Sequence, residues 1–386
     1  MNLYDMKNNA IQSPAIEYAA TPKMGTTLLR DIKTREDLSL AYTPGIADVC
    51  KLIVQDESAL RTHTFVRNNL AVISDGTAVL GLGNIGPKAS YPVMEGKAML
   101  FKRFGGIDAI PIIVHAKDDE ELITTIENIA DSFGAINLED FAAPRCFHIE
   151  EELKKRLSIP VMHDDQQGTA VVVLAAVTNA LTLFPHQQKD TKIVISGVGA
   201  AGVAVARLLI ASGYSNVVMV DSKGIIGKHR TDLTSEKVEL LKVTNQHNEQ
   251  GTLAHALKRA GVFIGVSKGN LLKAEDIQRM DKDAIVIAMA NPIPEIMPDV
   301  AKQAGAAIVA TGRSDFENQV NNALAFPGIF RAAIDMNTKI TQKMLVCAAQ
   351  AIVAYHQDHL SASSLLPSIL DDGVHLAIAN ALKANF

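Results

Sequence analysis

The chain is poor in cysteine and in aromatic residues. It has 386 residues without a single tryptophan, three cysteines, and 5% aromatic residues. Cys50, Cys146 and Cys347 are far apart and odd in number, so they form neither a disulfide framework nor a zinc-binding pattern and are typical of a reducing cytoplasm. The opening residues, MNLYDMKNNA, lack the apolar stretch of a secretory signal. These absences predict a cytoplasmic protein.

Blocks of basic residues and long apolar runs are also absent. The net charge is −5, which argues against nucleic acid as a partner. The longest apolar run, residues 170–184, is interrupted by Thr178 and Asn179. It is shorter than the roughly 18 residues that cross a bilayer, so we expect a buried helix and no membrane association. Hydrophobic residues make up 48% of the chain and charged residues 20%, which predicts an ordered protein with a large core.

The length favours two domains, which we place at residues 1–160 and 161–386. Strands alternate with helices throughout the second part, the pattern of a doubly wound Rossmann-type sheet. The strands are expected at residues 192–196, 217–220, 262–266, 284–288 and 307–309. Residues 338–384 are expected to be helical.

The first part is expected to be a smaller α/β unit with a short parallel sheet. Its strands are expected at 109–114, 135–138 and 160–162, with helices at 119–133 and 148–157 between them. Residues 70–82 are expected to form two further strands around a hairpin turn at Asp75 and Gly76.

Two helices in this part carry residues of interest. A helix over residues 39–53 would have Thr43 as its N-cap and Pro44 at its first position. Tyr42 precedes this turn, and the pattern alone favours a packing role for it. The helix at 92–104, opened by Pro92, places Lys97 within an apolar stripe. Such a lysine either extends its head group to water or faces a cavity, where desolvation beside a cation would lower its pKa and allow it to act as a base.

Four carboxylates follow two expected strands. Glu139 and Asp140 end the strand at 135–138, and Asp164 and Asp165 follow His163 after the strand at 160–162. Parallel α/β sheets bind ligands at the carboxyl ends of their strands. Clustered carboxylates repel one another unless a cation is present, and oxygen ligands favour Mg²⁺ or Mn²⁺. The pattern indicates a divalent-metal site, with a solvated acidic loop as the alternative.

A glycine-rich turn follows the expected strand at 192–196 and opens a helix. Its residues are Gly197, Val198, Gly199, Ala200, Ala201 and Gly202. The glycines permit a tight turn, close approach of a pyrophosphate, and close packing of helix on strand. Asp221 ends the next strand, where a carboxylate can hold a ribose hydroxyl. Asp221 favours NAD and the nearby Lys223 would tolerate NADP, so both cofactors remain open.

Three asparagines complete the candidate residues. Asn291 follows the strand at 284–288, and Asn321 and Asn322 lie in a loop before Phe326. Their amides could bind a carboxylate or a carboxamide, although asparagine in loops usually stabilises turns.

Taken together, these motifs resemble the malic enzyme family. The matching segments, in order, are AYTPG (41–45), EGK (95–97), INLEDF (136–141), HDDQQGTA (163–170), SGVGAAG (196–202), ANP (290–292) and NNALAFPG (321–328). The resemblance covers residues 20 to 335, and the length is similar to that of the short bacterial members.

The resemblance implies oxidative decarboxylation of (S)-malate to pyruvate and CO₂, with reduction of NAD or NADP and with Mg²⁺ or Mn²⁺, by a homo-oligomer that we expect to be a dimer. It implies that Tyr42 is the general acid and Lys97 the general base. The metal ligands would be Glu139, Asp140 and Asp165, with Asp164 as a supporting carboxylate. Asn291 would contact substrate or cofactor, and Asn321 and Asn322 the substrate.

One departure from the family concerns the substrate carboxylate. Long eukaryotic members carry an arginine near the position of Thr77 and Ala78, so another group must bind that carboxylate here. Two alternatives remain at this point. One is a related oxaloacetate decarboxylase without net redox chemistry, and the other is a non-catalytic dinucleotide-binding regulatory protein.

Overall fold

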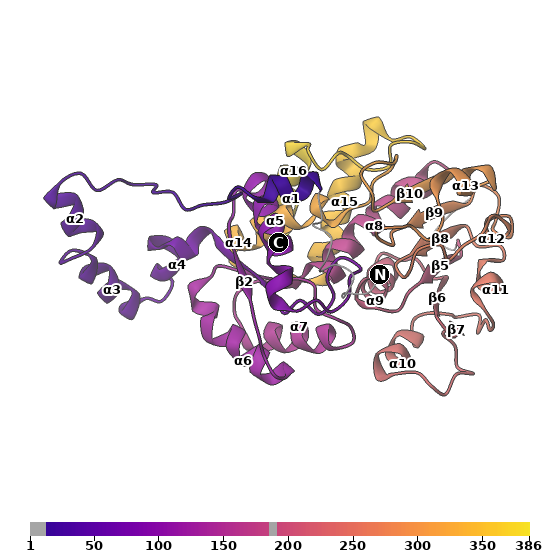
Figure 1. The fold of residues 1–386 in the computed structure, drawn as a ribbon, viewed down its shortest axis with the longest axis horizontal. Helices are drawn as coiled ribbons and strands as arrows, with labels where there is room; N and C mark the ends of the chain where they lie inside the picture. Colours follow the sequence, from indigo (N-terminus) through magenta and orange to yellow (C-terminus); the bar gives the residue numbers. More distant parts are fainter. Residues whose placement is uncertain (1–12, 185–190) are drawn as a thin grey trace.

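Two sheets organise the chain, as the computed structural model shows for residues 13–184 and 191–386. One sheet has four strands in the order β2-β1-β3-β4, and the other has six in the order β10-β9-β8-β5-β6-β7 (Figure 1). The α/β fold class expected from the sequence is therefore confirmed. The first ten residues, from which the absence of a secretory signal was inferred, lie outside the described residues.

The four-stranded sheet is entirely parallel. Its strands are β1 (Asn69–Ser74), β2 (Asp108–Ile113), β3 (Ile136–Leu138) and β4 (Val161–His163). Helices α5 (Pro87–Gly105), α6 (Asp119–Ile129) and α7 (Arg145–Arg156) provide the crossovers between them. The three strands expected after residue 108 are confirmed, and their carboxyl ends meet at one edge of the sheet.

The hairpin expected at residues 70–82 is wrong. β1 pairs with β2 on one side and β3 on the other, so it has no free edge for a hairpin partner. The Ser74 hydroxyl accepts the N–H of Gly76 and turns the chain into a loop over residues 75–86. Several glycines of this loop have a positive φ, which side chains rarely adopt: Gly76, Gly81, Gly83 and Gly86.

Two helix starts also differ from expectation. α5 begins at Pro87, after Gly86 with φ 80°, and Pro92 lies inside the helix. The single helix expected at 39–53 is two helices, α2 (Arg35–Ala41) and α3 (Ile46–Gln55). The reason is local. A capping box of Thr34 and Asp37 starts α2 upstream, and Gly45 rather than Thr43 precedes α3.

Residues 25–57, which we call the N-terminal arm, extend away from both sheets (Figure 1). Neither α2 nor α3 buries any residue, and even the apolar side chains of Leu40 and Val54 are 66% and 86% exposed. The chain rejoins the body at α4 (Ala59–His63), where Arg61 donates hydrogen bonds to the carbonyl oxygens of Gly134 and Ile334. The arm thus presents apolar side chains with no core of its own.

The six-stranded sheet is parallel apart from a short antiparallel edge strand, β7, that sequence reasoning missed. Its strands are β5 (Ile193–Ser196), β6 (Val217–Asp221), β7 (Gly224–Ile225), β8 (Val262–Gly265), β9 (Ile285–Ala288) and β10 (Ile308–Thr311). The helices around it are α8 (Asp164–Thr182), α9 (Ala200–Ala211), α10 (Ser235–Leu241), α11 (Leu253–Leu257), α12 (Ala274–Ile277) and α13 (Pro298–Gln303).

The apolar run at residues 170–184 forms most of α8, which is buried along almost its whole length as expected. Within residues 13–184 and 191–386, no helix has both the length and the apolar character needed to cross a membrane. The expected C-terminal helical region forms α15 (Gln342–His356) and α16 (Asp372–Asn385), and α14 (Phe326–Met336) precedes them. α14 returns to the first sheet, where Phe326 and Phe330 pack on Phe101 of α5 with ring centroids 4.6 and 5.3 Å apart.

The turn between β5 and α9 leads to a first prediction. A Cβ on Gly202 would collide with the carbonyl oxygen of Gly197, whereas a Cβ on Gly199 would meet nothing within 4 Å. We expect Gly202→Ala to lower the free energy of unfolding by about 1–3 kcal/mol, the usual cost of overpacking. Gly199→Ala should keep wild-type stability in urea titrations and weaken only dinucleotide binding. Equal stability losses in the two variants would contradict this account.

Candidate active site

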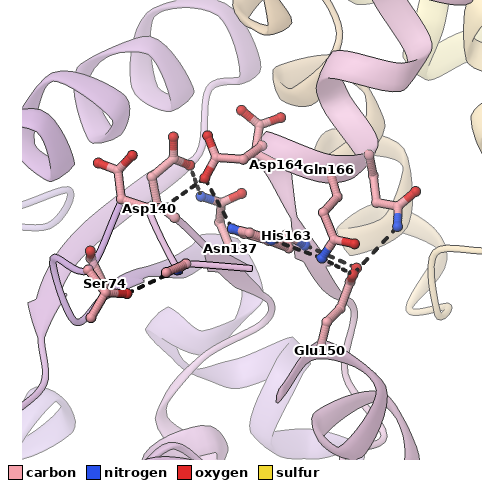
Figure 2. Close-up of polar contacts among 12 residues, drawn as sticks. Ser74, Asn137, Asp140, Glu150, His163, Asp164 and Gln166 are labelled. Atoms are coloured by element: carbon pink, nitrogen blue, oxygen red, sulfur yellow. Dashed lines mark hydrogen bonds and ion pairs between the residues drawn. The ribbon is translucent and has the colours of Figure 1, made fainter. Parts of the chain in front are cut away.

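The structure brings Lys97 and four carboxylates into one buried cluster. Lys97 extends from α5, and its ammonium lies 2.6 Å from Asp164 Oδ2 and 2.8 Å from Glu139 Oε1. Glu139 and Asp140 follow β3, and Asp164 and Asp165 open α8 directly after β4. The cluster therefore lies at the carboxyl edge of the four-stranded sheet, where the sequence placed it (Figure 2).

Further contacts fix the carboxylates in place. The side-chain amide of Asn137 donates to Glu139 Oε2 at 2.8 Å, and the backbone N–H of Asp140 donates to Asp165 Oδ2 at 2.7 Å. The ring of Phe326 lies below the Lys97 ammonium, with its centroid 4.4 Å away. Such contacts of a cation with an aromatic face favour the charged form of the lysine.

Burial and charge shift the pKa values of the cluster. Burial raises the pKa of Asp140 to about 7 and that of Glu139 well above its ordinary range. Burial acts to lower the pKa of Lys97, but the carboxylates of Asp164 and Glu139 outweigh it, so the pKa is raised. The lowered pKa expected for Lys97 from the sequence is therefore absent while these carboxylates are its neighbours. Burial also opposes ionisation of Asp165, yet its contact with His163 leaves its pKa lowered.

The carboxylates suit a divalent cation, although they do not enclose one as they stand. No group of three His, Cys, Asp or Glu side chains within residues 13–184 and 191–386 is arranged to hold a metal ion. However, Asp140 Oδ2 and Asp164 Oδ1 are buried and accept no hydrogen bond from any described residue. Buried oxygen acceptors without donors are costly, and a Mg²⁺ or Mn²⁺ ion would satisfy them.

The glycine-rich turn has the geometry of a pyrophosphate-binding turn. Gly197 follows β5 with φ 117°, and α9 begins at Ala200, so its N-terminus points out of the turn. Gly202 packs against the carbonyl oxygen of Gly197, where no side chain would fit. The positive end of α9 is suited to negative phosphates.

Asp221 ends β6 as expected, but its carboxylate is already fully engaged. Arg230 donates to both of its oxygens at 2.7 and 3.1 Å, Lys237 donates to Oδ2 at 2.7 Å, and the Lys223 N–H donates to Oδ1 at 2.9 Å. Partial burial acts to raise the pKa of Asp221, but Arg230 and Lys237 lower it to about 2. These four hydrogen bonds occupy the four acceptor positions of a carboxylate, so a ribose hydroxyl would have to displace one.

The three asparagines lie in different settings. Asn291 is exposed in the loop after β9, and its carbonyl oxygen lies against Gly81 of the 75–86 loop. Asn322 lies beside Gly168, one turn into α8. Asn321 uses its side chain to accept the N–H of Ala323 at 2.9 Å, which is turn chemistry.

Tyr42 does not join the cluster within its own chain. It is the C-terminal cap of α2 on the N-terminal arm and is 69% exposed. For Tyr42 to be the general acid, the N-terminal arm would therefore have to reach the lysine and carboxylate cluster of another chain.

Sequence reasoning missed the residues behind the carboxylates. Glu150 on α7, together with His163 and Gln166, forms a buried hydrogen-bonded group beside Asp165. In the sequence, Glu150 is marked only by its position next to the apolar face of the expected helix at 148–157, which gives no indication of its partners.

A doubly wound sheet with this glycine-rich turn is typical of a nicotinamide-dependent dehydrogenase. Comparison with known proteins then identifies the family. "Malic enzyme, N-terminal domain" matches residues 22–125, and "Malic enzyme, NAD binding domain" matches residues 166–383. The chain belongs to the malic enzyme family.

Relatives in this family match most of the chain. The bifunctional malic/malolactic enzyme of Bacillus subtilis is 49% identical over 91% of this chain and 87% of its own. The NADP-dependent malic enzyme of Halomonas elongata is 45% identical over 89% and 82%. The crystal structure of the NAD-dependent malic enzyme from Thermotoga maritima superposes with a TM-score of 0.93 at 45% identity, covering 97% of this chain and 99% of the other.

The cluster leads to a second prediction, made for metal-free protein. Lys97→Met removes the ammonium that is paired with the buried carboxylates, and breaking such a buried pair typically lowers the free energy of unfolding by about 3–5 kcal/mol. Burial raises the folded-state pKa values of three of the acids left behind, Glu139, Asp140 and Asp164, above their unfolded values of about 4. These acids therefore destabilise the fold increasingly as pH rises. The stability deficit should therefore be larger at pH 8 than at pH 5.5 in urea titrations. Lys88→Met, on the exposed face of the same helix, is the control. A deficit independent of pH would contradict the charge-balance account.

Proposed function

We propose that the chain oxidises (S)-malate with NAD⁺ or NADP⁺ and decarboxylates the product to pyruvate and CO₂. The observation that carries this proposal is the buried contact of Lys97 with Asp164 and Glu139 at the carboxyl edge of the first sheet. The reaction needs a base at the substrate hydroxyl and a cation site beside it. Membership in the malic enzyme family supports the same reaction.

We further propose that Glu139, Asp140 and Asp165 hold a Mg²⁺ or Mn²⁺ ion, with Asp164 in support. The ion would supply Lewis-acid stabilisation of the negative charge that develops on the substrate oxygen during decarboxylation. The buried, unpartnered oxygens of Asp140 and Asp164 support this assignment.

The proton transfers fall to two side chains of the protein. Lys97 would accept the hydroxyl proton of malate, and the nicotinamide, when bound, would supply the hydride acceptor for C2. To accept the proton, Lys97 must first be neutral, which requires that its carboxylate partners be neutralised by the bound cation. The resulting β-keto acid loses its C4 carboxylate as CO₂, and Tyr42 donates a proton to C3 of the enol to give pyruvate. Asn291, Asn321 and Asn322 would contact the substrate, and Asn291 the cofactor as well.

The third prediction tests this function directly. Purified protein with malate and Mn²⁺ should form reduced cofactor and pyruvate in equal amounts. Since Arg230 and Lys237 already neutralise Asp221, we expect both NAD⁺ and NADP⁺ to be used.

Asp165→Ala should lose this malate-oxidising activity and bind Mn²⁺ much more weakly in a calorimetric titration, while keeping its fold. Decarboxylation of oxaloacetate without malate oxidation would support the non-redox alternative, and unchanged Mn²⁺ affinity would remove Asp165 from the ligand set.

We propose that Tyr42 acts on a partner subunit in a homodimer. The N-terminal arm exposes Leu40, Val54 and Tyr42 itself, and it buries none of the residues of α2 and α3. Exposed apolar groups of this kind mark protein–protein contacts. In a symmetric dimer each arm would reach the other chain's site, so that two composite sites form.

The fourth prediction separates exchange of arms from action within one chain. Tyr42→Phe and Lys97→Ala chains, each inactive alone, are co-expressed with different affinity tags and purified as heterodimers. If arms exchange, one site of each heterodimer combines an intact Lys97 with an intact Tyr42. Activity should then reach about half that of the wild type, because one of the two sites is intact. Heterodimers no more active than their parents would show that Tyr42 does not act across the dimer.

Two further proposals concern the domain boundary and the location of the protein in the cell. We place the division between the substrate-binding and dinucleotide-binding domains at residues 160 and 161, directly before β4. We also propose a cytoplasmic location, which the free state of Cys50, Cys146 and Cys347 supports.

A further inference from the structure

Another buried carboxylate, outside the candidate metal ligands, lies behind the site. Glu150 on α7 is only 5% exposed. Its Oε1 accepts from Lys154 Nζ at 2.6 Å and from the His163 N–H at 3.1 Å. Its Oε2 accepts from Gln166 Nε2 at 2.9 Å and, more weakly, from Gln167 Nε2 at 3.5 Å. The reaction proposed above makes no use of this residue, so its burial and its full set of donors need another explanation.

Glu150 determines which way the Gln166 amide points. A carboxylate oxygen can only accept, so the group of Gln166 that faces it must be the NH₂. The opposite orientation would place the amide oxygen against the carboxylate, with repulsion and two unsatisfied acceptors in a buried site. Figure 2 shows Glu150 reaching from its helix toward both Gln166 and His163.

The orientation of Gln166 in turn determines the tautomer of His163. Gln166 Nε2 also lies 2.9 Å from His163 Nδ1. An amide nitrogen has hydrogens and no acceptor capacity, so Nδ1 must be the acceptor. The proton of a neutral imidazole is then on Nε2, at the other side of the ring.

His163 Nε2 faces the candidate metal ligand Asp165. The distance to Asp165 Oδ2 is 3.0 Å, although the atoms are not aligned as a full hydrogen bond, so the contact is mainly electrostatic. The Asp140 N–H donates to the same oxygen at 2.7 Å. With its proton on Nε2, His163 attracts the carboxylate; with the proton on Nδ1, a lone pair would face Asp165 and repel it.

We propose that Glu150 is a positioning residue for the metal site. It fixes the Gln166 amide, which fixes the His163 tautomer, which holds the Asp165 carboxylate in the orientation that binds the cation. The inference rests on the proposed function only in taking Asp165 as a metal ligand. Groups that orient a metal ligand in this way typically contribute 10–100-fold to metal affinity.

The test replaces Glu150 by its isosteric amide. In Glu150→Gln the new side chain can donate or accept, so both orientations of Gln166 and both tautomers of His163 become accessible. Metal-free protein labelled with ¹⁵N-histidine reports the tautomer through the chemical shifts of the two ring nitrogens, with His163→Asn to assign the signals. At a pH high enough to keep the His163 ring neutral, we expect Nε2–H alone in the wild type and a mixture of tautomers in the variant. The Kd for Mn²⁺, measured by electron paramagnetic resonance titration, should rise by about 10–100-fold.

Matched variants make the result decisive. Glu151→Gln changes the neighbouring exposed carboxylate and should leave both the tautomer and the Mn²⁺ affinity at wild-type values. Gln166→Met removes the amide that links Glu150 to His163, so it should also give a mixture of His163 tautomers and a raised Kd for Mn²⁺. This variant tests the inference if Glu150→Gln fails to fold. A wild-type tautomer or a wild-type Kd in the folded variant overturns the inference. If Asp165→Ala binds Mn²⁺ as the wild type does, Asp165 is not a metal ligand and the metal assignment fails. A tautomer change in Glu150→Gln would then still show that Glu150 controls His163, so the two failures are distinguishable.

Discussion

The site depends on one buried cation that balances a larger number of acids. Lys97 is in contact with Asp164 and Glu139, and two further carboxylates, Asp140 and Asp165, lie beside them. Keeping all of these groups ionised away from water would cost free energy. Burial accordingly raises the pKa of Asp140 to about 7. A protein selected for stability alone would replace such a group with apolar side chains. The presence of the cluster despite that cost indicates that charge is needed here, and a divalent cation would relieve the surplus of negative charge.

Topology explains why these residues meet. Every strand of the first sheet is parallel to its neighbours, so the residues that follow β3 and β4 emerge at the same edge. α8 begins with Asp164 at that edge and then runs into the hydrophobic core that it shares with α9 and α15. Gly168 leaves room for the Asp164 carboxylate one helical turn later, where a Cβ would collide with Oδ1. Carboxylates, lysine and dinucleotide turn are thus fixed to a single packed framework.

The sequence predicted the parts of the structure that follow from local patterns. Buried strands, the glycine turn and the carboxylates at strand ends all depend on short segments, and they lie where they were expected. The hairpin at residues 70–82 failed because local turn signals cannot reveal that both edges of β1 are occupied. Thr43 and Pro44 resemble a helix start, yet the stronger capping box of Thr34 and Asp37 begins the helix earlier. Glu150, His163 and Gln166 could not be grouped from sequence, because only the packing of α7 against β4 and α8 brings them together. The exposure of Tyr42 was equally inaccessible to local patterns, since it follows from how the whole arm is placed.

The buried helix α8 has a consequence for how such a protein can change over evolutionary time. Its first turn carries Asp164 and Asp165, and its body packs along α9, which begins directly after the glycine-rich turn. Both helices consist largely of small and branched residues with little free volume between them. A larger side chain at their contact would displace both ends at once, and no surface loop could absorb the shift. Divergence along these two helices should therefore proceed by paired, volume-conserving exchanges, whereas the exposed arm and the outer helices are free to drift singly.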